Sequence, residues 1–434
     1  MLIQRASLLD DSVVDIRVDE QIDEVAVRLI PQSGEQVFDA AEGTVIPGLH
    51  DHHVHLYSAA AARDSLWVGP PRVRTSAGMA AALAAAKPGN DGWIRAIGYH
   101  ESVAGDLDRE RLDAVRPQIP VRVQHRSGVL WILNSAGLAR VGLPDHPDGR
   151  LRSEDRGWSD ALRQREIDLS DLSRRLSGYG ITGVTDATPN LGAGDIVELV
   201  EAHRHGGLRQ RVLCLAPGKR ILHDDRLDLD ELTAWIIDRH EAGGPVAVHC
   251  VTAAQLVITL AALRSAGSHP RDRIEHAAVV PQDNLGDLAE LGVTVVTQPN
   301  FIAERGDQYL ADVPEDEQHE LWRLASLLRA KVPVALSSDM PFGTGDPWAA
   351  MRAAVHRKTA SGGVLGADEC VSASTALAMF VGHPDRPADA RTVQVGQLGD
   401  LCVLSAPPDD VLETLDSDMV AATVIGGNVV FERG

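Results

Sequence analysis

The sequence predicts an α/β fold with a parallel sheet in its central part and a small β-sandwich built from both ends of the chain. The centre of the 434-residue chain alternates short apolar strands with amphipathic helices, a rhythm typical of a parallel sheet, open or closed. About forty residues at each end instead alternate apolar and polar side chains, as half-buried antiparallel strands do.

The terminal strands are expected at Val13–Val18, Glu24–Leu29, Asp400–Leu404 and Ala422–Phe431. The central strands are expected at Ile181–Thr185, Val212–Ala216, Pro245–Cys250, Arg273–His276, Val293–Gln298 and Val332–Ser337. The helices between and after them are expected at Gly194–His203, Asp230–His240, Ala253–Ser265, Glu317–Ala330 and Pro347–Arg357, with Asp230 as an N-cap. The segment 64–166 is rich in Gly, Pro and Arg and interrupts this rhythm, which indicates an insertion.

Composition excludes several classes of protein. The 62 acidic residues against 41 basic ones give a net charge of −21, which argues against nucleic acids and anionic membranes as partners. No apolar run is long enough to span a membrane, and the start of the chain does not have the pattern of a secretory signal. The four cysteines are scattered and form neither a disulfide framework nor a Cys-x-x-Cys pattern. We therefore expect a cytoplasmic protein.

The first chemical signal is the histidine-rich segment from Pro47 to His55. On a strand, Asp51, His53 and His55 project from one face, and two imidazoles at that spacing can bind one cation. His50 and His52 have the same spacing on the opposite face, so the pattern alone leaves two registers open. A polar strand end with surface histidines is the alternative without a metal.

Further candidate ligands end later strands. His249, His276 and Asp339 each lie at the carboxyl end of a predicted strand, where the sites of parallel α/β folds are built. One such residue alone is more often a buried, hydrogen-bonded side chain, but several of ligand type together suit zinc or a similar ion. Lys219, one of only four lysines, follows an apolar strand and is either a site residue or a lysine in a surface turn.

Together these segments resemble the amidohydrolase superfamily of metal-dependent hydrolases, most closely its N-substituted formamide deformylase-like branch. The similar motifs are Pro47–His55, Gly180–Thr185, Ala247–His249, Ile274–Ala277, Ser338–Pro341, the Asn134–Leu138 block of this branch, and Gly396–Leu401. The resemblance favours the register that uses His53 and His55.

The resemblance implies a distorted (β/α)8 TIM barrel at 47–390 with the insertion at about 64–166, and a β-sandwich of 1–46 with 391–434. It also implies hydrolysis of a C–N bond, in an amide, formamide, imide or carbamate-like small molecule, through a metal-activated water. Members of the family are often oligomers, so a homo-oligomer is compatible with the sequence, although no apolar stripe marks an interface.

The implied metal ligands are His53, His55, Lys219, His249, His276 and Asp339, which would hold one or two ions of zinc or another divalent first-row metal. Carboxylated Lys219 would bridge two ions. However, Lys219 follows the strand Val212–Ala216 with no room for a crossover helix. A one-metal site of His53, His55, His249 and Asp339, with His276 near the substrate, is therefore the alternative.

Asp339 and His276 are the expected catalytic residues, and Tyr99, His125, Trp131, Gln298 and Met340 are the expected substrate-binding residues. Two other functions compete. A deaminase of the same superfamily would carry a glutamate three residues after the strand-5 histidine, whereas Thr252 stands there. A non-catalytic barrel relative would have lost ligands that this chain keeps.

Overall fold

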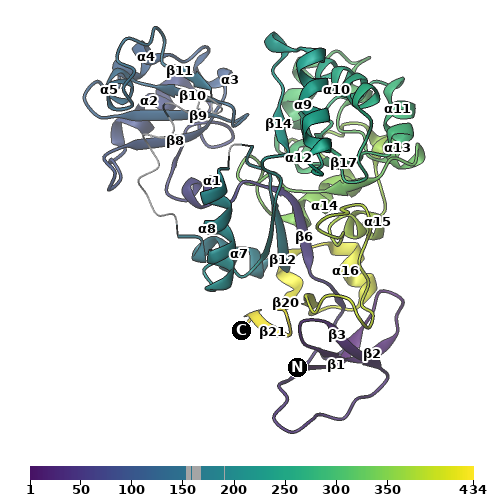
Figure 1. Cartoon of the computed structure of the whole chain (residues 1–434). Helices are drawn as coiled ribbons and strands as arrows, with labels where there is room; N and C mark the ends of the chain where they lie inside the picture. Colours follow the sequence, from purple (N-terminus) through teal and green to yellow (C-terminus); the bar gives the residue numbers. More distant parts are fainter. Residues whose placement is uncertain (153–157, 159–167, 190) are drawn as a thin grey trace. The chain divides into compact units, whose positions relative to one another are not determined.

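The computed structural model describes residues 1–152, 158, 168–189 and 191–434. The chain has a mixed α/β fold that divides into two compact units (Figure 1). Met1–His55 and Leu169–Gly434 form the first unit, and Leu56–Asp168 form the second. Among the described residues, no helix is both long and apolar enough to cross a membrane.

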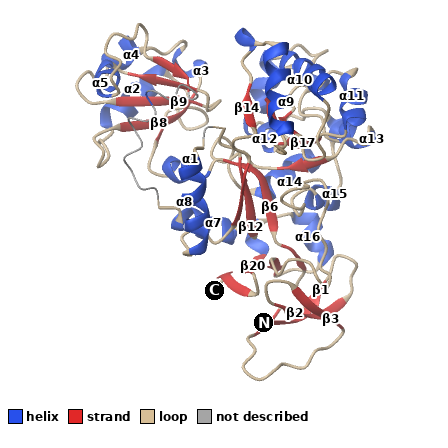
Figure 2. Ribbon diagram, viewed as in Figure 1, coloured by secondary structure: helices blue, strands red, loops and turns tan. Residues whose placement is uncertain are grey.

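Both ends of the chain build a pair of four-stranded sheets in the first unit. One sheet has the order β3-β2-β1-β4, with β1 at Leu2–Ser7, β2 at Val13–Val18, β3 at Ile22–Ala26 and β4 at Val37–Asp39. The other has the order β21-β20-β19-β5, with β5 at Val45–Pro47, β19 at Leu401–Leu404, β20 at Val420–Ile425 and β21 at Asn428–Glu432. Ile3 and Ile16 share one buried core with Leu401 and Val424, so the two sheets pack on each other (Figure 2).

The centre of the first unit holds parallel strands in two further sheets. One has the order β13-β12-β6, with β6 at Leu49–Val54, β12 at Ile181–Asp186 and β13 at Arg211–Cys214. The other runs in chain order through β14 (Lys219–Ile221), β15 (Ala247–Cys250), β16 (Arg273–His276), β17 (Thr294–Thr297) and β18 (Val334–Leu336). Helices α8 (Ala193–Arg204), α9 (Leu229–Glu241), α10 (Ala253–Ala266) and α11 (Asn284–Leu291) connect successive strands. The strand–helix rhythm of the sequence is confirmed.

The described strands do not close into a barrel. β6 and the chain after β18 meet at one parallel bridge, between Val54 and Met340. β13 and β14 lie in different sheets and are joined by the short segment 215–218. Because these two strands are not neighbours in one sheet, the chain needs no crossover helix between them. Lys219 is thus the first residue of β14, in register with Ala247 of β15.

One predicted helix is wrong. Instead of a helix at Glu317–Ala330, the chain forms a 3-10 turn, η3 (Gln318–Glu320), and a short helix, α13 (Ala325–Arg329). Between them Trp322 is buried with φ at +50° and donates its backbone N–H to Ala278 O at 2.8 Å. Tertiary burial and backbone pairing therefore override the helical pattern.

The start of α9 also differs from the prediction. The N-cap is Asp228 rather than Asp230, because the Asp228 side chain accepts a hydrogen bond from Glu231 N at 2.9 Å. The helix consequently begins at Leu229, one residue before the predicted start.

The second unit has its own sheet and core. The sheet order is β11-β10-β9-β8-β7, with β7 at Leu66–Trp67, β8 at Ile94–Tyr99, β9 at Val121–His125, β10 at Leu130–Leu133 and β11 at Arg150–Arg152. Helices α2 (Ser76–Ala85), α3 (Glu101–Ala104), α4 (Arg109–Asp113) and α5 (Ser135–Arg140) accompany it. Much of the C-terminal part of the expected insertion, 153–157 and 159–166, lies outside the described residues.

The Asn134–Leu138 motif has a structural role. The Asn134 side chain is fully buried, caps α5 by accepting from Gly137 N at 2.8 Å, and accepts from Val121 N at 2.9 Å. Its amide group donates to two further backbone carbonyls, those of Arg116 and Ile119. This asparagine therefore holds together the segments that flank it.

A buried carboxylate joins the C-terminal strands to β13. Asp400 accepts from Arg211 Nε at 2.8 Å and Nη2 at 3.2 Å, and from Gly426 N at 3.0 Å.

We expect Asp400→Ala to lower the free energy of unfolding by about 3 kcal/mol, because it leaves a half-buried guanidinium without its main partner. Urea denaturation measures this loss. Glu20→Ala is the matched control, since Glu20 also pairs with Arg211 but its side chain is 75% exposed. Glu20→Ala should lower the free energy of unfolding by less than about 1 kcal/mol. Equal losses in the two variants would contradict the structural role of Asp400.

Candidate metal centre

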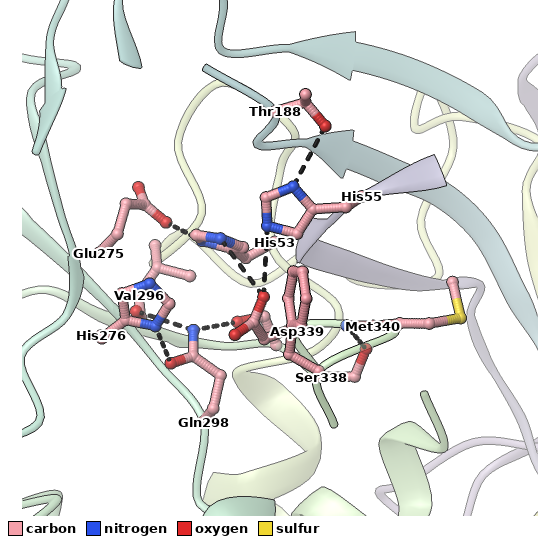
Figure 3. A network of polar contacts seen from close by, with 12 residues as sticks. His53, His55, Thr188, Glu275, His276, Val296, Gln298, Ser338, Asp339 and Met340 are labelled. Atoms are coloured by element: carbon pink, nitrogen blue, oxygen red, sulfur yellow. Dashed lines mark hydrogen bonds and ion pairs between the residues drawn. The ribbon is translucent and has the colours of Figure 1, made fainter. Parts of the chain in front are cut away.

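Two histidines from the end of β6 and one aspartate after β18 converge. The ligand atoms of His53, His55 and Asp339 all lie within 4.8 Å of one another. Asp339 Oδ1 is 3.4 Å from His55 Nε2 and 3.7 Å from His53 Nε2 (Figure 3). The backbone holds the same residues together, since Asp339 N donates to His53 O at 3.0 Å and His55 N donates to Met340 O at 2.8 Å.

Two of the predicted site residues have a left-handed backbone. The φ of Asp339 is +53° and that of His276 is +72°. Residues other than glycine rarely adopt this backbone conformation, although aspartate and histidine do so more often than most. Such conformations are typical of functional sites, where the surrounding structure holds them in place. Asp339 is held through its backbone, because its carbonyl accepts from Phe342 N at 2.7 Å and from Gly343 N at 3.0 Å.

A fully buried carboxylate orients His53. Glu275 accepts a hydrogen bond from His53 Nδ1, and Arg273 donates to Glu275 from Nε at 2.7 Å and from Nη2 at 3.0 Å. With its proton on Nδ1, the neutral imidazole directs the lone pair of Nε2 toward Asp339. Burial, and then the charge of Lys219, hold the pKa of His53 well below its ordinary value, so the ring is neutral at pH 7.

Sequence reasoning missed Glu275 as a site residue. Strand alternation places it on the face opposite His276, and the predicted ligand was His276. The signal that could have identified Glu275 was its pairing with Arg273. These two residues of opposite charge stand at alternate positions of a strand predicted to be buried. Buried charges of opposite sign usually serve each other or a site.

His276 lies beside His53, and His249 lies beside His276. The ring centroid of His276 is 4.8 Å from that of His53 and 4.4 Å from that of His249. His276 Nδ1 is 2.7 Å from Gln298 Oε1, and Gln298 Nε2 donates to Ser337 Oγ at 2.8 Å. Because the amide oxygen of Gln298 must accept, Nδ1 of His276 carries the proton and Nε2 keeps its lone pair. Burial lowers the pKa of His249 to about 3 and that of His276 well below 6.5.

Lys219 is buried at the start of β14. Its Nζ has no hydrogen-bond partner among the described residues, and burial lowers its pKa to about 8. The carboxylates of Glu275 and Asp339 partly oppose this shift, so the amine lies within electrostatic reach of the site. A lysine with this pKa is partly uncharged near neutral pH and can react as a nucleophile.

The donor set suits a divalent metal ion. His53 Nε2, with its lone pair, and the buried Asp339 Oδ1, which has no hydrogen-bond partner among the described residues, face each other without a proton between them. A cation removes this unfavourable arrangement. Bond lengths of about 2.0–2.2 Å to zinc imply ligand separations of roughly 3.4 Å in a tetrahedral site, close to the two separations around Asp339 Oδ1.

The other residues of the β6 motif serve the strand rather than this group. Asp51, expected on the same face as His53, turns to the loop after β18 and accepts from Ser338 N at 3.0 Å and from Ser338 Oγ. Burial raises the pKa of Asp51 to about 6. His50 and His52 stack on each other with ring centroids 4.5 Å apart, and His50 Nε2 lies 2.8 Å from Thr185 Oγ1.

The predicted substrate-binding residues fall in both units. In the first, Gln298 is buried against His276, and Met340 is buried with its Sδ 3.0 Å from Arg175 Nη2. In the second, Tyr99 is buried with its hydroxyl donating to Gly105 O, and Trp131 packs against Trp158. His125 is half-buried beside Glu101. Substrate binding by these residues stays a prediction.

Comparison with known proteins adds a family and a fold. Residues 36–431 match the sequence model of the Amidohydrolase family. The N-substituted formamide deformylase of Arthrobacter pascens is 26% identical over 94% of this chain and 92% of its own length. An uncharacterized metal-dependent hydrolase from Pyrococcus horikoshii has a similar structure, with a TM-score of 0.73, 18% identity, and coverage of 95% of this chain and 98% of that one. A 5-methylcytosine deaminase from Klebsiella pneumoniae gives a TM-score of 0.57 at 15% identity, over 100% of this chain and 98% of its own.

The orientation of His53 can be tested by changing its carboxylate partner. We expect Glu275→Gln to weaken zinc binding about 10- to 100-fold, because the neutral amide makes the imidazole a poorer ligand than the carboxylate does. Competition with a chromophoric zinc chelator measures the affinity. Glu369→Gln is the control, since Glu369 is also buried but binds the backbone of Leu324 and Ser326. This control should lower stability without changing zinc affinity, and a similar weakening in both variants would refute the role of Glu275.

Proposed function

Because the chain belongs to the Amidohydrolase family, it is a metal-dependent hydrolase of carbon–nitrogen bonds, and we propose that His53, His55 and Asp339 form the centre of its reaction site. The observation that carries the proposal is the convergence of two imidazole nitrogens on one buried carboxylate oxygen. Neutral imidazole and carboxylate are the donors that zinc prefers, so zinc is the metal we propose.

We infer a second layer of ligands around this group. The ring of His276 contacts that of His53, the ring of His249 contacts that of His276, and Lys219 interacts electrostatically with Asp339, which supports a site for two ions. The uncharged amine of Lys219 can bond to the carbon of CO2 and lose a proton, and the resulting carbamate would replace a buried cation by an anionic ligand. The single-ion site of His53, His55, His249 and Asp339 is the competing arrangement.

We also propose that the two parallel sheets correspond to the (β/α)8 barrel of the family. The sheets β13-β12-β6 and β14 to β18 supply eight parallel strands, and the bridge between Val54 and Met340 supports a closed order at one junction. His53, His55, His249, His276 and Asp339 lie at or just after the carboxyl ends of these strands, as expected for a site at the carboxyl end of a barrel, whereas Lys219 begins β14.

A bound divalent ion supplies two kinds of chemistry, a lowered pKa of water and polarisation of a carbonyl oxygen. Within the protein, we propose that the Asp339 carboxylate accepts the proton of the attacking water and returns it to the leaving nitrogen. His276 carries its proton on Nδ1, bound to Gln298, so its Nε2 acts as an acceptor. This tautomer favours His276 as a ligand over His276 as a donor to the carbonyl oxygen.

We propose a small uncharged N-acyl, N-formyl or carbamate-like substrate. The likeness to an N-substituted formamide deformylase supports an N-formyl compound. The ring of Phe342, whose centroid is 5.2 Å from that of His55, gives the site an apolar side. Deamination is less favoured, since Thr252 stands where a proton-carrying glutamate is expected. Homo-oligomerisation, the exclusion of nucleic acid and a cytoplasmic location stay predictions of the sequence.

The proposed function is tested with a substrate panel. Zinc-loaded enzyme is assayed for amine release from N-formyl amines, N-acyl amino acids, cyclic imides and carbamates. At least one of these classes should be hydrolysed, with N-formyl amines preferred. Hydrolysis of esters or lactones alone would show that the C–N assignment is wrong.

Asp339→Asn should reduce kcat at least about 1,000-fold, because the amide cannot carry the proton between water and the leaving nitrogen. Some metal should stay bound, since His53 and His55 remain. Turnover and metal content are measured on the same sample. Asp346→Asn, which alters an N-cap carboxylate in the same stretch of chain, should keep its turnover. Undiminished turnover of Asp339→Asn would exclude the proton-transfer role.

The number of ions is tested at Lys219. We expect Lys219→Ala to lower the metal content about two-fold, because a bridging ligand is lost from a two-ion site. Elemental analysis of dialysed protein gives the ratio of metal to chain. Lys358→Ala removes an exposed lysine and should change nothing. An unchanged ratio in Lys219→Ala would favour the single-ion site.

A further inference from the structure

A cavity lies at the amino ends of parallel strands in the first unit. Its volume is about 180 Å³, whereas a water molecule takes up about 30 Å³ in the liquid, so it has room for a small anion. Its wall includes Gly218, just before β14, residues 245–246, just before β15, and Arg273, the first residue of β16. His249 and His276 lie toward the other ends of β15 and β16. The cavity is therefore separate from the proposed metal centre.

Positive charge is concentrated around this cavity. Arg239 of α9 and Arg271, just before β16, line it together with Arg273. Asp385 is the only acidic side chain of its wall among the described residues. Glu275 neutralises Arg273. The other two arginines still exceed Asp385 by one positive charge, although the whole chain carries a net charge of −21. A local excess of this kind attracts anions.

The Arg273 guanidinium has donors that the protein leaves unused. Its Nε and Nη2 donate to Glu275, and Nη2 also donates to His52 O. Its Nη1 is buried and has no hydrogen-bond partner among the described residues. A guanidinium carries five N–H donors, so the two on Nη1 are left over. Because a buried donor without an acceptor is unfavourable, we expect an acceptor here that the described residues do not supply.

Arg239 offers a second unpaired donor. Its Nε is buried and has no hydrogen-bond partner among the described residues. Its guanidinium lies against Gly244, since a Cβ on that glycine would be 2.5 Å from Arg239 Nη2. Gly244 directly precedes Pro245, a residue of the cavity wall. The glycine therefore leaves the space in which the guanidinium lies beside the cavity.

Guanidinium groups are suited to oxyanions. Their N–H donors lie in one plane, in a fork that matches two oxygens of a phosphate or a carboxylate. Such an anion accepts hydrogen bonds from the unpaired nitrogens and also balances positive charge, whereas a water molecule only accepts. The cavity has an open side by which an anion can enter, because Arg271 and Asp385 of its wall are exposed.

We propose that this cavity binds one small oxyanion, a phosphate or a short carboxylate, through Arg239, Arg271 and Arg273. The site shares no residue with the proposed metal ligands and does not depend on C–N hydrolysis. The anion would complete the hydrogen bonding of the same guanidinium that fixes Glu275. Arg273 is therefore left unchanged in the tests.

The test measures phosphate binding to the full-length protein by equilibrium dialysis at constant ionic strength. We expect Arg271→Met to weaken this binding about 10-fold or more, as the loss of a charge-assisted hydrogen bond does. Arg264→Met is the matched control, because Arg264 is also exposed but pairs with Asp287 and lies outside the wall. It should keep the affinity. Phosphate bound at the metal centre is common to both variants, so equal affinities would overturn the proposal.

A second pair of variants should act in opposite directions. Asp385→Asn removes a negative charge from the wall and should strengthen phosphate binding about two- to five-fold. Arg239→Met removes a buried donor and should weaken the binding about 10-fold. Arg271 and Asp385 are exposed, so their variants test the proposal even if Arg239→Met does not fold. Unchanged affinity in Asp385→Asn and Arg271→Met would overturn it.

Formate and acetate are tested as competitors in the same dialysis. If either anion binds more tightly than phosphate, a carboxylate is the preferred occupant of the site, and if both bind more weakly, phosphate is. Either result supports an oxyanion site when Arg271→Met weakens it. No measurable binding of any of the three anions would overturn the proposal.

Discussion

The proposed reaction site depends on one buried ionic contact, the pairing of Arg273 with Glu275. Glu275 is fully buried, so its charge is tolerable only because the guanidinium donates to both carboxylate oxygens. Arg273 also donates to His52 O at 2.7 Å, which attaches β16 to β6. The charged carboxylate then decides which nitrogen of His53 carries the proton. The orientation of His53 therefore follows from a charge pair outside the proposed ligand group.

A second constraint comes from the backbone. Hydrogen bonds between the end of β6 and residues 339–340 bring together segments that lie nearly three hundred positions apart in the chain. They hold the side chains of these segments at about the separation that ligands of one ion require. The same bonds hold Asp339 in a left-handed conformation that costs on the order of 1–3 kcal/mol. Rigid strands thus place the side chains, and two of the proposed site residues, His276 and Asp339, have a left-handed backbone.

Much of the site could be predicted from the sequence because it follows simple rules. Alternation along a strand left the pairs His50 with His52 and His53 with His55, and the family resemblance favoured the second pair. The strand-end rule pointed to Asp339. Glu275 was missed because alternation places it on the face opposite His276, although it contacts His53 of a strand in another sheet. The helix expected at Glu317–Ala330 failed because Trp322 is buried by residues distant in sequence. The difficulty with Lys219 arose from an assumption that β13 and β14 are neighbours in one sheet, which no local pattern can test.

The sandwich made from both chain ends has a consequence for how the protein is synthesised. Ile3 and Ile16 are covered by Leu401 and Val424, residues that leave the ribosome long after them. During translation the N-terminal strands therefore keep an apolar face exposed to solvent. The strands and helices of the centre can already fold in that time. The strands that close the sandwich also bring Asp400 against Arg211. A truncated chain without the C-terminal strands therefore exposes this apolar face, which chaperones and proteases can recognise.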